Sequence, residues 1–337
     1  MSKKTTNTHE VSIEDVLEDV TPTTPLVQKL RNDIRSQLKR IGELELAAGA
    51  NEDFLDSVRE AISTITPLEP VRYIPKNRKV DHPMSAVVVF SDWHIGEVVR
   101  ASEVEGFNAY NWDIAQKRAY YFGKVFTDAI TVQQSTAVID ELVVVVIGDM
   151  ISGDLHHELV AHNEFPSPEQ AIRAGCLLSK TIAELAPHFK TIRVEFIVID
   201  NHSRLTKKMQ FKGGGENSYG NVVGFVARER LSSHKNVTFG LHKSIQELVE
   251  IQGFRYLCGH GATIKGFAGI PWYGIDRKVA KEAKARRRMV EDKTFDKLIL
   301  GHYHTPIRTP DFMMNGSMSG TTEYDHGEGR HANPCQE

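Results

Sequence analysis

Two histidines, His302 and His304, stand one residue apart directly after a short apolar run that ends at Gly301. The run, residues 297–300, is typical of a buried strand, and the glycine lets the chain turn where the strand ends. Side chains two residues apart in an extended or turning segment point to the same side, so both imidazoles can face one pocket. A surface loop can also carry two histidines, so the pair indicates a site only if other strands end in the same way.

Four other apolar runs also end in Asp, Asn or His. They cover residues 86–90, 141–147, 194–199 and 254–258. The carboxyl ends of strands are where α/β sheets collect their ligands, so we expect these side chains to converge. The expected set consists of Asp92, His94, Asp149, Asn201, His260, His302 and His304.

The chemistry of this set points to metal ions. Burying so many polar groups without partners would cost roughly 2–7 kcal/mol for each group. A divalent cation removes that cost, and the set is too large for one tetrahedral ion but suits two ions bridged by a carboxylate. Mixed imidazole and carboxylate ligands favour Mn, with Fe, Zn, Ni or Co as alternatives, over Mg or Ca. The set contains no cysteine, which argues against a structural zinc site.

Helical patterns separate the first strands. Asn111 can cap one helix, and Ser167 opens a capping box with Gln170 at the start of another. Residues 245–251 and 254–258 flank a Gln-Gly pair like the two arms of a hairpin. Strands that alternate with helices and then form a hairpin predict an α/β fold with antiparallel additions.

Length and composition limit the class of protein. The 337 residues suit one large domain with an appendage, and the formal net charge of −3 gives no overall attraction to nucleic acid. The three cysteines are scattered, which argues against a disulfide framework and fits a reducing compartment. The start lacks the apolar core of a signal peptide, and no apolar run reaches about 18 residues. We therefore expect a cytoplasmic protein that spans no membrane.

The first part of the chain differs from the rest. Residues 1–24 are expected to be mobile. Apolar residues at helical spacing predict an amphipathic helix from residue 25 to about residue 46, and residues 51–63 resemble a second one, so that residues 25–66 form a helical extension. The helices of residues 25–64 can pack on the main domain or mediate homo-oligomer formation, and one apolar stripe does not distinguish these alternatives.

Five short blocks along the chain resemble the signature of the calcineurin-like metallophosphoesterases. In chain order they are SDWHIG, IGDM, DNHSR, CGHG and GHYHT. The resemblance covers about residues 86–320 and implies a four-layer α/β/β/α sandwich. We therefore assign residues 85–324 to a metallophosphoesterase domain, with a Pro-rich, basic linker at residues 67–84 before it and a tail at residues 325–337 after it.

The resemblance also implies a role for each residue. The first ion would be held by Asp92, His94, Asp149 and His304. Asp149 would bridge to a second ion held by Asn201, His260 and His302. Two cations lower the pKa of a bound water, so that hydroxide can attack the phosphorus near neutral pH. His202 would lie beside the phosphate and, as general acid, protonate the leaving oxygen.

The roles of several residues near the candidate ligands in the sequence stay open. Asp200 stands where the family usually has glycine, so either the backbone angle differs or a carboxylate is added beside His202. Arg204 can reach the phosphate bidentately or be an ordinary surface residue. Asp154 and His156 can form a pair that supports the metal ligands from behind, or His156 can touch substrate near the first ion. SbcD-type repair nucleases of the superfamily carry another histidine shortly after the same aspartate.

The phosphate ester itself is not identified by the ligand set. Lys207 and Lys208 follow the site closely, and Arg286 and Arg287 lie on a basic predicted helix that could form a cationic wall for a polyanion. The same helix can instead be a solvated basic face. The stretches NHSRLTKK and NGSMSGTTEYD resemble phosphoesterases encoded by bacteriophages. This resemblance also favours DNA and would place the protein in the cytoplasm of a host cell.

Three hypotheses follow from these residues. The first is a Mn-dependent phosphodiesterase that acts on DNA as an exonuclease or endonuclease. The second is a phosphomonoesterase or a nucleotide or cyclic-nucleotide phosphodiesterase, including a protein phosphatase. The third is a metal-stabilised scaffold without activity, and the complete ligand set together with His202 argues against it.

Overall fold

The computed structural model describes residues 83–154, 157–265, 269–331 and 333–337, together with scattered positions between residues 32 and 73. The main body of these residues belongs to one compact unit, residues 61–337. The helical extension at residues 25–66, its role in oligomer formation and the linker at residues 67–84 fall almost entirely outside the described residues and stay predictions.

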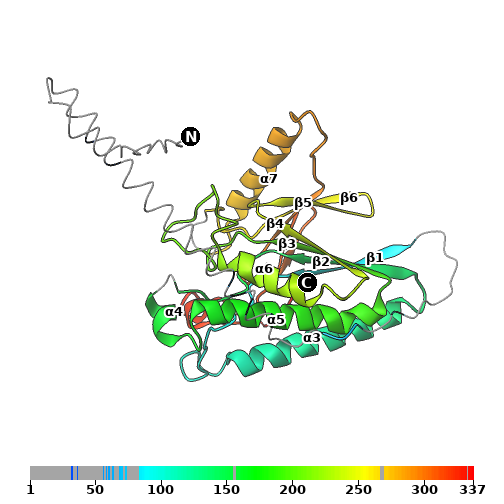
Figure 1. Cartoon of the computed structure of the whole chain (residues 1–337). Helices are drawn as coiled ribbons and strands as arrows, with labels where there is room; N and C mark the ends of the chain where they lie inside the picture. Colours follow the sequence, from blue (N-terminus) through cyan, green and yellow to red (C-terminus); the bar gives the residue numbers. More distant parts are fainter. Residues whose placement is uncertain are drawn as a thin grey trace, which may run out of the picture. The chain divides into compact units, whose positions relative to one another are not determined.

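The first sheet consists of four parallel strands in the order β1-β2-β3-β4 (Figure 1). They are β1 (Met84–Phe90), β2 (Ile139–Val146), β3 (Thr191–Ile197) and β4 (Val237–His242). The run from Leu142 to Val146 is fully buried, as expected for a central parallel strand that is covered on both faces. Because all four strands run in one direction, their carboxyl ends meet at one edge.

The second sheet is mixed and has the strand order β5-β6-β7-β9-β8. Its strands are β5 (Glu247–Ile251), β6 (Phe254–Cys258), β7 (Lys297–Leu300), β8 (Ile307–Arg308) and β9 (Phe312–Met314). The predicted hairpin is confirmed, since β5 and β6 are antiparallel and Gln252 and Gly253 have the positive φ values, 53° and 80°, that a tight hairpin turn needs. β6 runs parallel to β7, so these two strands also end at a common edge.

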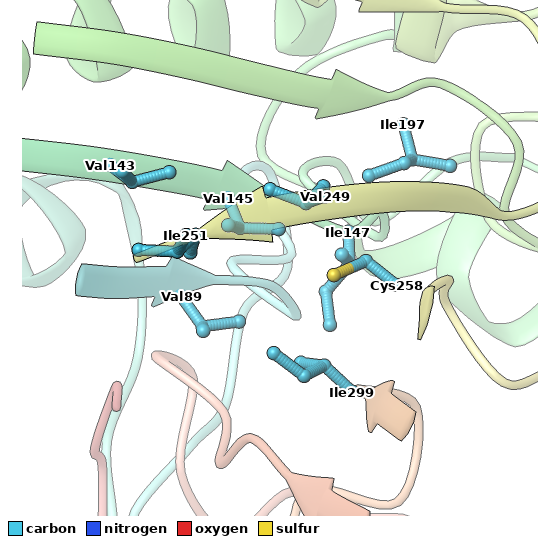
Figure 2. Packing of buried hydrophobic residues seen from close by; sticks show 9 residues of the cluster. All are labelled: Val89, Val143, Val145, Ile147, Ile197, Val249, Ile251, Cys258 and Ile299. Carbon is cyan, nitrogen blue, oxygen red and sulfur yellow. The ribbon is translucent and has the colours of Figure 1, made fainter. Parts of the chain in front are cut away.

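The two sheets face each other across a hydrophobic core (Figure 2). β2 contributes Val143 and Val145, and the second sheet contributes Val249, Ile251 and Ile299. Each of these side chains is at most 5% exposed, and burying one of them contributes roughly 1.5–3 kcal/mol. This packing sets the positions of the strand ends of one sheet relative to those of the other.

Helices cover the outer faces of both sheets (Figure 1). Beside the first sheet lie α3 (Trp112–Gln133), α5 (Ser167–Leu185) and α6 (Tyr219–Arg230). On the second sheet, Ile275 and Val279 of α7 (Trp272–Arg286) pack with Leu257 and Leu298. Shorter helices are α4 (His157–His162), η1 (Ala186–His188) and α8 (Glu323–Gly327). The predicted α/β/β/α sandwich is confirmed.

No helix among the described residues combines the length and the apolar character that crossing a membrane requires.

One of the two predicted helix starts is confirmed and the other is wrong. Asn111 caps α3 as predicted, because its Oδ1 accepts a hydrogen bond from Ile114 N at 3.0 Å. The capping box at Ser167 was a wrong prediction, since Pro166 is the N-cap of α5 and makes no side-chain cap. The buried side chain of Gln170 instead accepts a hydrogen bond from Gly153 N at 2.9 Å. Gln170 therefore holds the loop that follows β2 rather than the start of its own helix.

Residues 325–337 are not a separate tail. Oε1 of Gln336 accepts hydrogen bonds from Ser91 N at 2.9 Å and from Trp93 Nε1 at 3.1 Å. The carbonyl of Glu337 accepts another from Val89 N at 2.6 Å. The predicted boundary at residue 324 falls inside α8, and after that helix the chain returns to the end of β1.

An ion pair on the first sheet makes stability depend on pH. His242 Nε2 lies 2.6 Å from Glu195 Oε2, and this hydrogen bond raises the pKa of His242 above its ordinary value. Burial opposes ionisation of Glu195, but His242 and Arg193 outweigh burial and lower the pKa of Glu195. The carboxylate therefore stays charged near neutral pH. The stabilisation is complete below the unfolded pKa of His242 and disappears as the pH rises through its folded pKa.

We expect His242→Gln to lower the free energy of unfolding by about 0.5–1 kcal/mol near pH 6, because the pair is partly exposed. The difference from the unmodified protein should shrink steadily as the pH is raised through the folded pKa of His242. Urea unfolding of both proteins in EDTA measures this difference in the free energy of unfolding. A difference that does not change with pH would contradict the role of this ion pair.

Candidate metal centre

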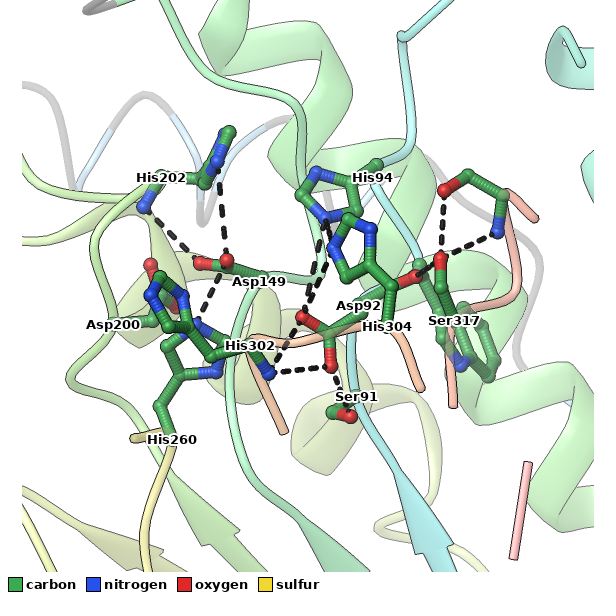
Figure 3. Close-up of polar contacts among 12 residues, drawn as sticks. Ser91, Asp92, His94, Asp149, Asp200, His202, His260, His302, His304 and Ser317 are labelled. Atoms are coloured by element: carbon green, nitrogen blue, oxygen red, sulfur yellow. Dashed lines mark hydrogen bonds and ion pairs between the residues drawn. The ribbon is translucent and has the colours of Figure 1, made fainter. Parts of the chain in front are cut away.

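Strand ends from both sheets meet in one polar cluster (Figure 3). It takes Asp92 and His94 from the end of β1, Asp149 from β2, His260 from β6, and His302 and His304 from β7. All of these are predicted ligands. Their ligand atoms form groups of three that lie within 4.8 Å of one another: Asp92, His94 and His304; His94, Asp149 and His202; and Asp149, His260 and His302. Clustered His and Asp side chains of this kind can bind divalent metal ions.

The first group contains three of the four residues predicted for the first ion. Nε2 of His94 and Nε2 of His304 face each other at 3.1 Å, and Asp92 Oδ1 lies 4.0 Å and 3.5 Å from these two nitrogens. The carboxylate of Asp92 also accepts hydrogen bonds from the backbone N–H of His302, at 3.0 and 3.1 Å. Asp92 thus links the first sheet to the loop that follows β7.

The second group is built around Asp149. Its Oδ2 lies 2.8 Å from His260 Nε2, and its Oδ1 accepts a hydrogen bond from His202 N at 3.1 Å. The other ring nitrogen of His260, Nδ1, is 2.9 Å from the carbonyl of Ile147. Because a carbonyl can only accept, Nδ1 carries the hydrogen, and Nε2 is the nitrogen directed to the cluster.

Asn201 completes the predicted set. It follows β3 and precedes His202, whose backbone N–H is bonded to Asp149. The side-chain Oδ1 of Asn201 is buried and has no hydrogen-bond partner among the described residues. A buried oxygen in this state costs about 1–3 kcal/mol, and coordination of a cation would remove the cost. The donors present therefore fit a pair of divalent ions.

Backbone strain is concentrated at the cluster. Positive φ angles occur at Asp92 (54°), His94 (47°), Asp149 (47°), His302 (73°) and His304 (55°). Side chains other than glycine rarely adopt this region, and such strain costs of order 1–3 kcal/mol at each position. The surrounding fold holds these residues in conformations that their own preferences oppose, as is typical of a functional site.

Burial and charge separate the pKa values of the imidazoles. Burial lowers the pKa of His94 to about 3 and that of His302 to about 4. Burial also disfavours a charged His260, but the adjacent Asp149 outweighs it and raises the pKa of His260 to about 9. Near neutral pH, His94 and His302 therefore carry the lone pairs that a divalent cation takes, while a positive His260 balances Asp149 in the absence of metal.

Asp200, in the place where the family usually has glycine, closes the turn after β3. Its Oδ1 accepts hydrogen bonds from Ser203 N at 2.6 Å and from Ser203 Oγ at 2.7 Å. Its φ angle is not positive, and the carboxylate is directed to Ser203 rather than to His202. Gly148 makes room for this side chain, since a Cβ there would lie 2.6 Å from the Cβ of Asp200.

His202 lies at the edge of the cluster. Its Nδ1 is 2.6 Å from the carbonyl of Ser152, so Nδ1 carries a hydrogen and Nε2 is the nitrogen that can exchange a proton. Nε2 is 3.9 Å from Asp149 Oδ2. The ring of His202 lies edge-on to the ring of His94, with 4.6 Å between the centroids.

The predicted basic residues on the loop after His202 have different surroundings. The guanidinium of Arg204 donates hydrogen bonds to the carbonyls of Asn201 and Thr206, so it braces the loop and is not directed into the cluster. Lys207 and Lys208 follow it and are exposed.

The predicted substrate residues on α7 are not brought to the cluster by any contact among the described residues. Nε of Arg286 pairs with Glu282 Oε2 at 3.2 Å on the same helix, and Arg287 is exposed. His156, the other predicted site residue, lies outside the described residues.

Two buried carboxylates near the cluster were missed by the sequence analysis. Asp325 Oδ2 lies 3.2 Å from His304 Nδ1, and Glu97 Oε2 lies 3.9 Å from His94 Nδ1. Burial raises the pKa of Glu97 to about 7. Thr322 and Asp325 match the spacing of a capping box, so that signal was available in the sequence, whereas no pattern singles out Glu97.

A comparison with protein-family models finds no match, and neither does a search among curated proteins. Among solved structures, an archaeal phosphodiesterase matches with a TM-score of 0.29 and 9% identity, over 69% of this chain and 84% of that chain. Zinc-bound Vps29 from Entamoeba histolytica matches with a TM-score of 0.27 and 14% identity, over 69% and 75%. A purple acid phosphatase from yellow lupin (Lupinus luteus) seeds matches with a TM-score of 0.29 and 12% identity, over 75% and 35%.

The chain brings its five sequence blocks to one region of the structure. Its five blocks lie at the ends of five strands, in two facing sheets with helices outside them. The chain therefore has the two-sheet sandwich that the sequence resemblance implies, and its candidate metal ligands meet at the strand ends.

Proposed function

We propose that the protein is a phosphoesterase that works with two divalent metal ions, with manganese as the preferred metal. The observation that carries the proposal is the convergence of six predicted ligands from both sheets, together with the buried, unpartnered oxygen of Asn201. A scaffold protein would have no use for strained backbone at five of these positions or for an imidazole held at their edge.

In this proposal the chain positions the groups that act on the ester. Asp92, His94, Asp149 and His304 would hold one ion, and Asp149, Asn201, His260 and His302 the other. When bound, such ions lower the pKa of a water molecule and neutralise charge on phosphoryl oxygens. His202 donates through Nδ1 to Ser152, so its Nε2 would deliver the proton that the leaving oxygen needs.

DNA is the substrate class that we favour, with the protein acting as a phosphodiesterase of the exonuclease or endonuclease type. Support comes from Lys207 and Lys208, which are exposed on the loop that begins at Asn201 and His202. A duplex or single strand that presents one phosphate to the cluster would bring the next phosphates to such a loop. The exposed Arg287, directly after α7, supplies further positive charge, whereas Arg286 is held by Glu282.

A second candidate is a monoesterase or a nucleotide or cyclic-nucleotide phosphodiesterase, including a protein phosphatase. It is favoured by a cavity of about 390 Å³ next to Glu97, which approaches His94. Glu103, Glu158 and Glu323 also line this cavity. Carboxylates repel a polyanion, so this side of the site suits a compact substrate better than a nucleic-acid strand.

A matrix of metals and substrates tests the proposal. The metal-free protein is loaded with Mn, Zn, Mg or Ni and offered single- and double-stranded DNA, RNA, cyclic nucleotides and aryl phosphates. Metal-dependent cleavage of DNA supports the first candidate, and cleavage of small esters alone supports the second. No hydrolysis of any ester with any metal would contradict the proposed function.

Asp149→Asn should lose both metal and activity, because an amide is a weaker donor than the carboxylate proposed to bridge the two ions. Metal analysis after dialysis against Mn measures the bound equivalents. Asp154→Asn, which changes an exposed carboxylate in the same loop, should keep its metal and serves as the control. Full retention of Mn in Asp149→Asn would contradict the bridging role.

His202→Ala should keep its metal content and lower turnover by about 10²–10⁴-fold on esters with an alkyl leaving group. The loss should be much smaller on a p-nitrophenyl ester, because p-nitrophenolate leaves without a proton. Steady-state kinetics on both esters provides the comparison, with His157→Ala on the exposed face of α4 as the control. Equal losses on the two esters would speak against proton donation.

Charge reversal of Lys207 and Lys208 should weaken cleavage of DNA far more than cleavage of p-nitrophenyl phosphate. Each lysine that contacts a phosphate should also contribute about one unit to the slope of log affinity against log salt concentration. Filter binding at several salt concentrations gives this slope, and Lys235→Glu, another exposed lysine, is the matched control. Equal losses on both substrates would exclude a specific role in holding DNA.

A further inference from the structure

His304 is held on both sides of its ring. Nε2 is directed to the cluster, 3.1 Å from Nε2 of His94 and 3.5 Å from Asp92 Oδ1. On the opposite side, Nδ1 lies 3.2 Å from Oδ2 of Asp325. A carboxylate cannot donate when ionised, so Nδ1 carries a hydrogen and Nε2 is the nitrogen that faces the cluster.

Asp325 is itself fixed in place. It is 5% exposed, at the third position of the short helix α8. Thr322 Oγ donates to its Oδ2 at 2.9 Å, and Arg330 Nη2 lies 3.4 Å from its Oδ1. The side chain therefore cannot turn away from His304 without losing contacts to residues on both sides of the helix.

We propose that Asp325 is a positioning residue of the metal centre, which sets the orientation and the donor strength of His304. The inference depends on the proposed metal centre and deepens it. A carboxylate behind a metal-binding imidazole fixes its tautomer and makes the ring a stronger donor, and loss of such a partner typically costs 10–100-fold in metal affinity. Asp325 lies outside all five blocks that indicate the site.

The histidines of the cluster differ in the groups that lie behind their rings. The ring of His260 has the neutral carbonyl of Ile147 behind it, whereas the ring of His304 has a carboxylate. The ring of His94 has no hydrogen-bonded partner behind it among the described residues, since Glu97 Oε2 is 3.9 Å from its Nδ1. The two ions are therefore held by unequally supported histidines, and the ion at Asp92, His94 and His304 should bind more tightly.

The alternative is that Asp325 serves only as the capping residue of α8, since Thr322 and Asp325 form a capping box. The two roles can be separated by substitution. Asp325→Ala removes the acceptor and Asp325→Asn keeps an acceptor oxygen without the charge. Thr322→Val disrupts the capping box and leaves the carboxylate in place.

Calorimetric titration of the metal-free full chain with Mn²⁺ alone tests the proposal. The unmodified protein should bind in a tight and a weaker step. Asp325→Ala should weaken the tight step by about 10–100-fold, Asp325→Asn should lie between, and the weaker step should change little. Thr322→Val should lower the melting temperature and weaken Mn²⁺ binding much less than Asp325→Ala, because the carboxylate and its contact with Arg330 remain.

Unchanged Mn²⁺ binding in both Asp325 variants would overturn the proposal, and so would an equal loss in Thr322→Val. Thermal unfolding of each metal-free variant shows whether it folds. If Asp325→Ala does not fold, the Mn²⁺ affinity of Asp325→Asn tests the proposal. A protein that binds Mn²⁺ as described but hydrolyses no phosphate ester would refute the proposed function and leave the role of Asp325 standing. A protein that binds no Mn²⁺ would refute both.

Discussion

The carboxylate of Asp149 is almost completely withdrawn from solvent, and its pKa nevertheless lies well below the ordinary value. Burial alone would raise that pKa, but the positive charge and hydrogen bonding of His260 and the charge of His202 reverse the effect. A buried carboxylate is tolerated only when positive charge surrounds it. Since His202 follows the first sheet and His260 the second, the charge balance at Asp149 exists only when both sheets pack together.

The same dependence appears in the backbone around the site. Asp92 has a positive φ, and its carbonyl accepts hydrogen bonds from Met318 N at 3.0 Å and Ser317 Oγ at 3.0 Å. Gly301 approaches the Asp92 side chain so closely that a Cβ would lie 2.6 Å from Oδ2. The last part of the chain therefore supports the first strand, and local strain at the site is offset by contacts from distant segments.

The sequence predicts the strands that lead to the site, because each is an apolar run with a polar end and both signals are local. It does not predict α6 or β4, whose glycines resemble helix and strand breakers. Gly224 allows α6 to pack closely against β4, since a Cβ at this position would lie 2.3 Å from Leu241 of β4. That reason depends on a tertiary contact and cannot be seen in a single sequence.

The candidate ligands follow from the same local pattern, but the groups around them do not. The pairing of Asp325 with His304 joins positions that only the fold brings together, and the direction of the Arg204 guanidinium depends on the shape of its loop. Asp200 shows the same limit, since its bond to Ser203 could not be chosen over a contact with His202 from residue types alone.

Anomalous diffraction at the manganese edge, from crystals of the full chain soaked in Mn²⁺, tests the central claim most directly. The account predicts two peaks about 3.5–4 Å apart, both within coordination distance of Asp149, with Asn201 Oδ1 beside one of them. A single peak away from Asp149, or no peak among these side chains, would contradict it.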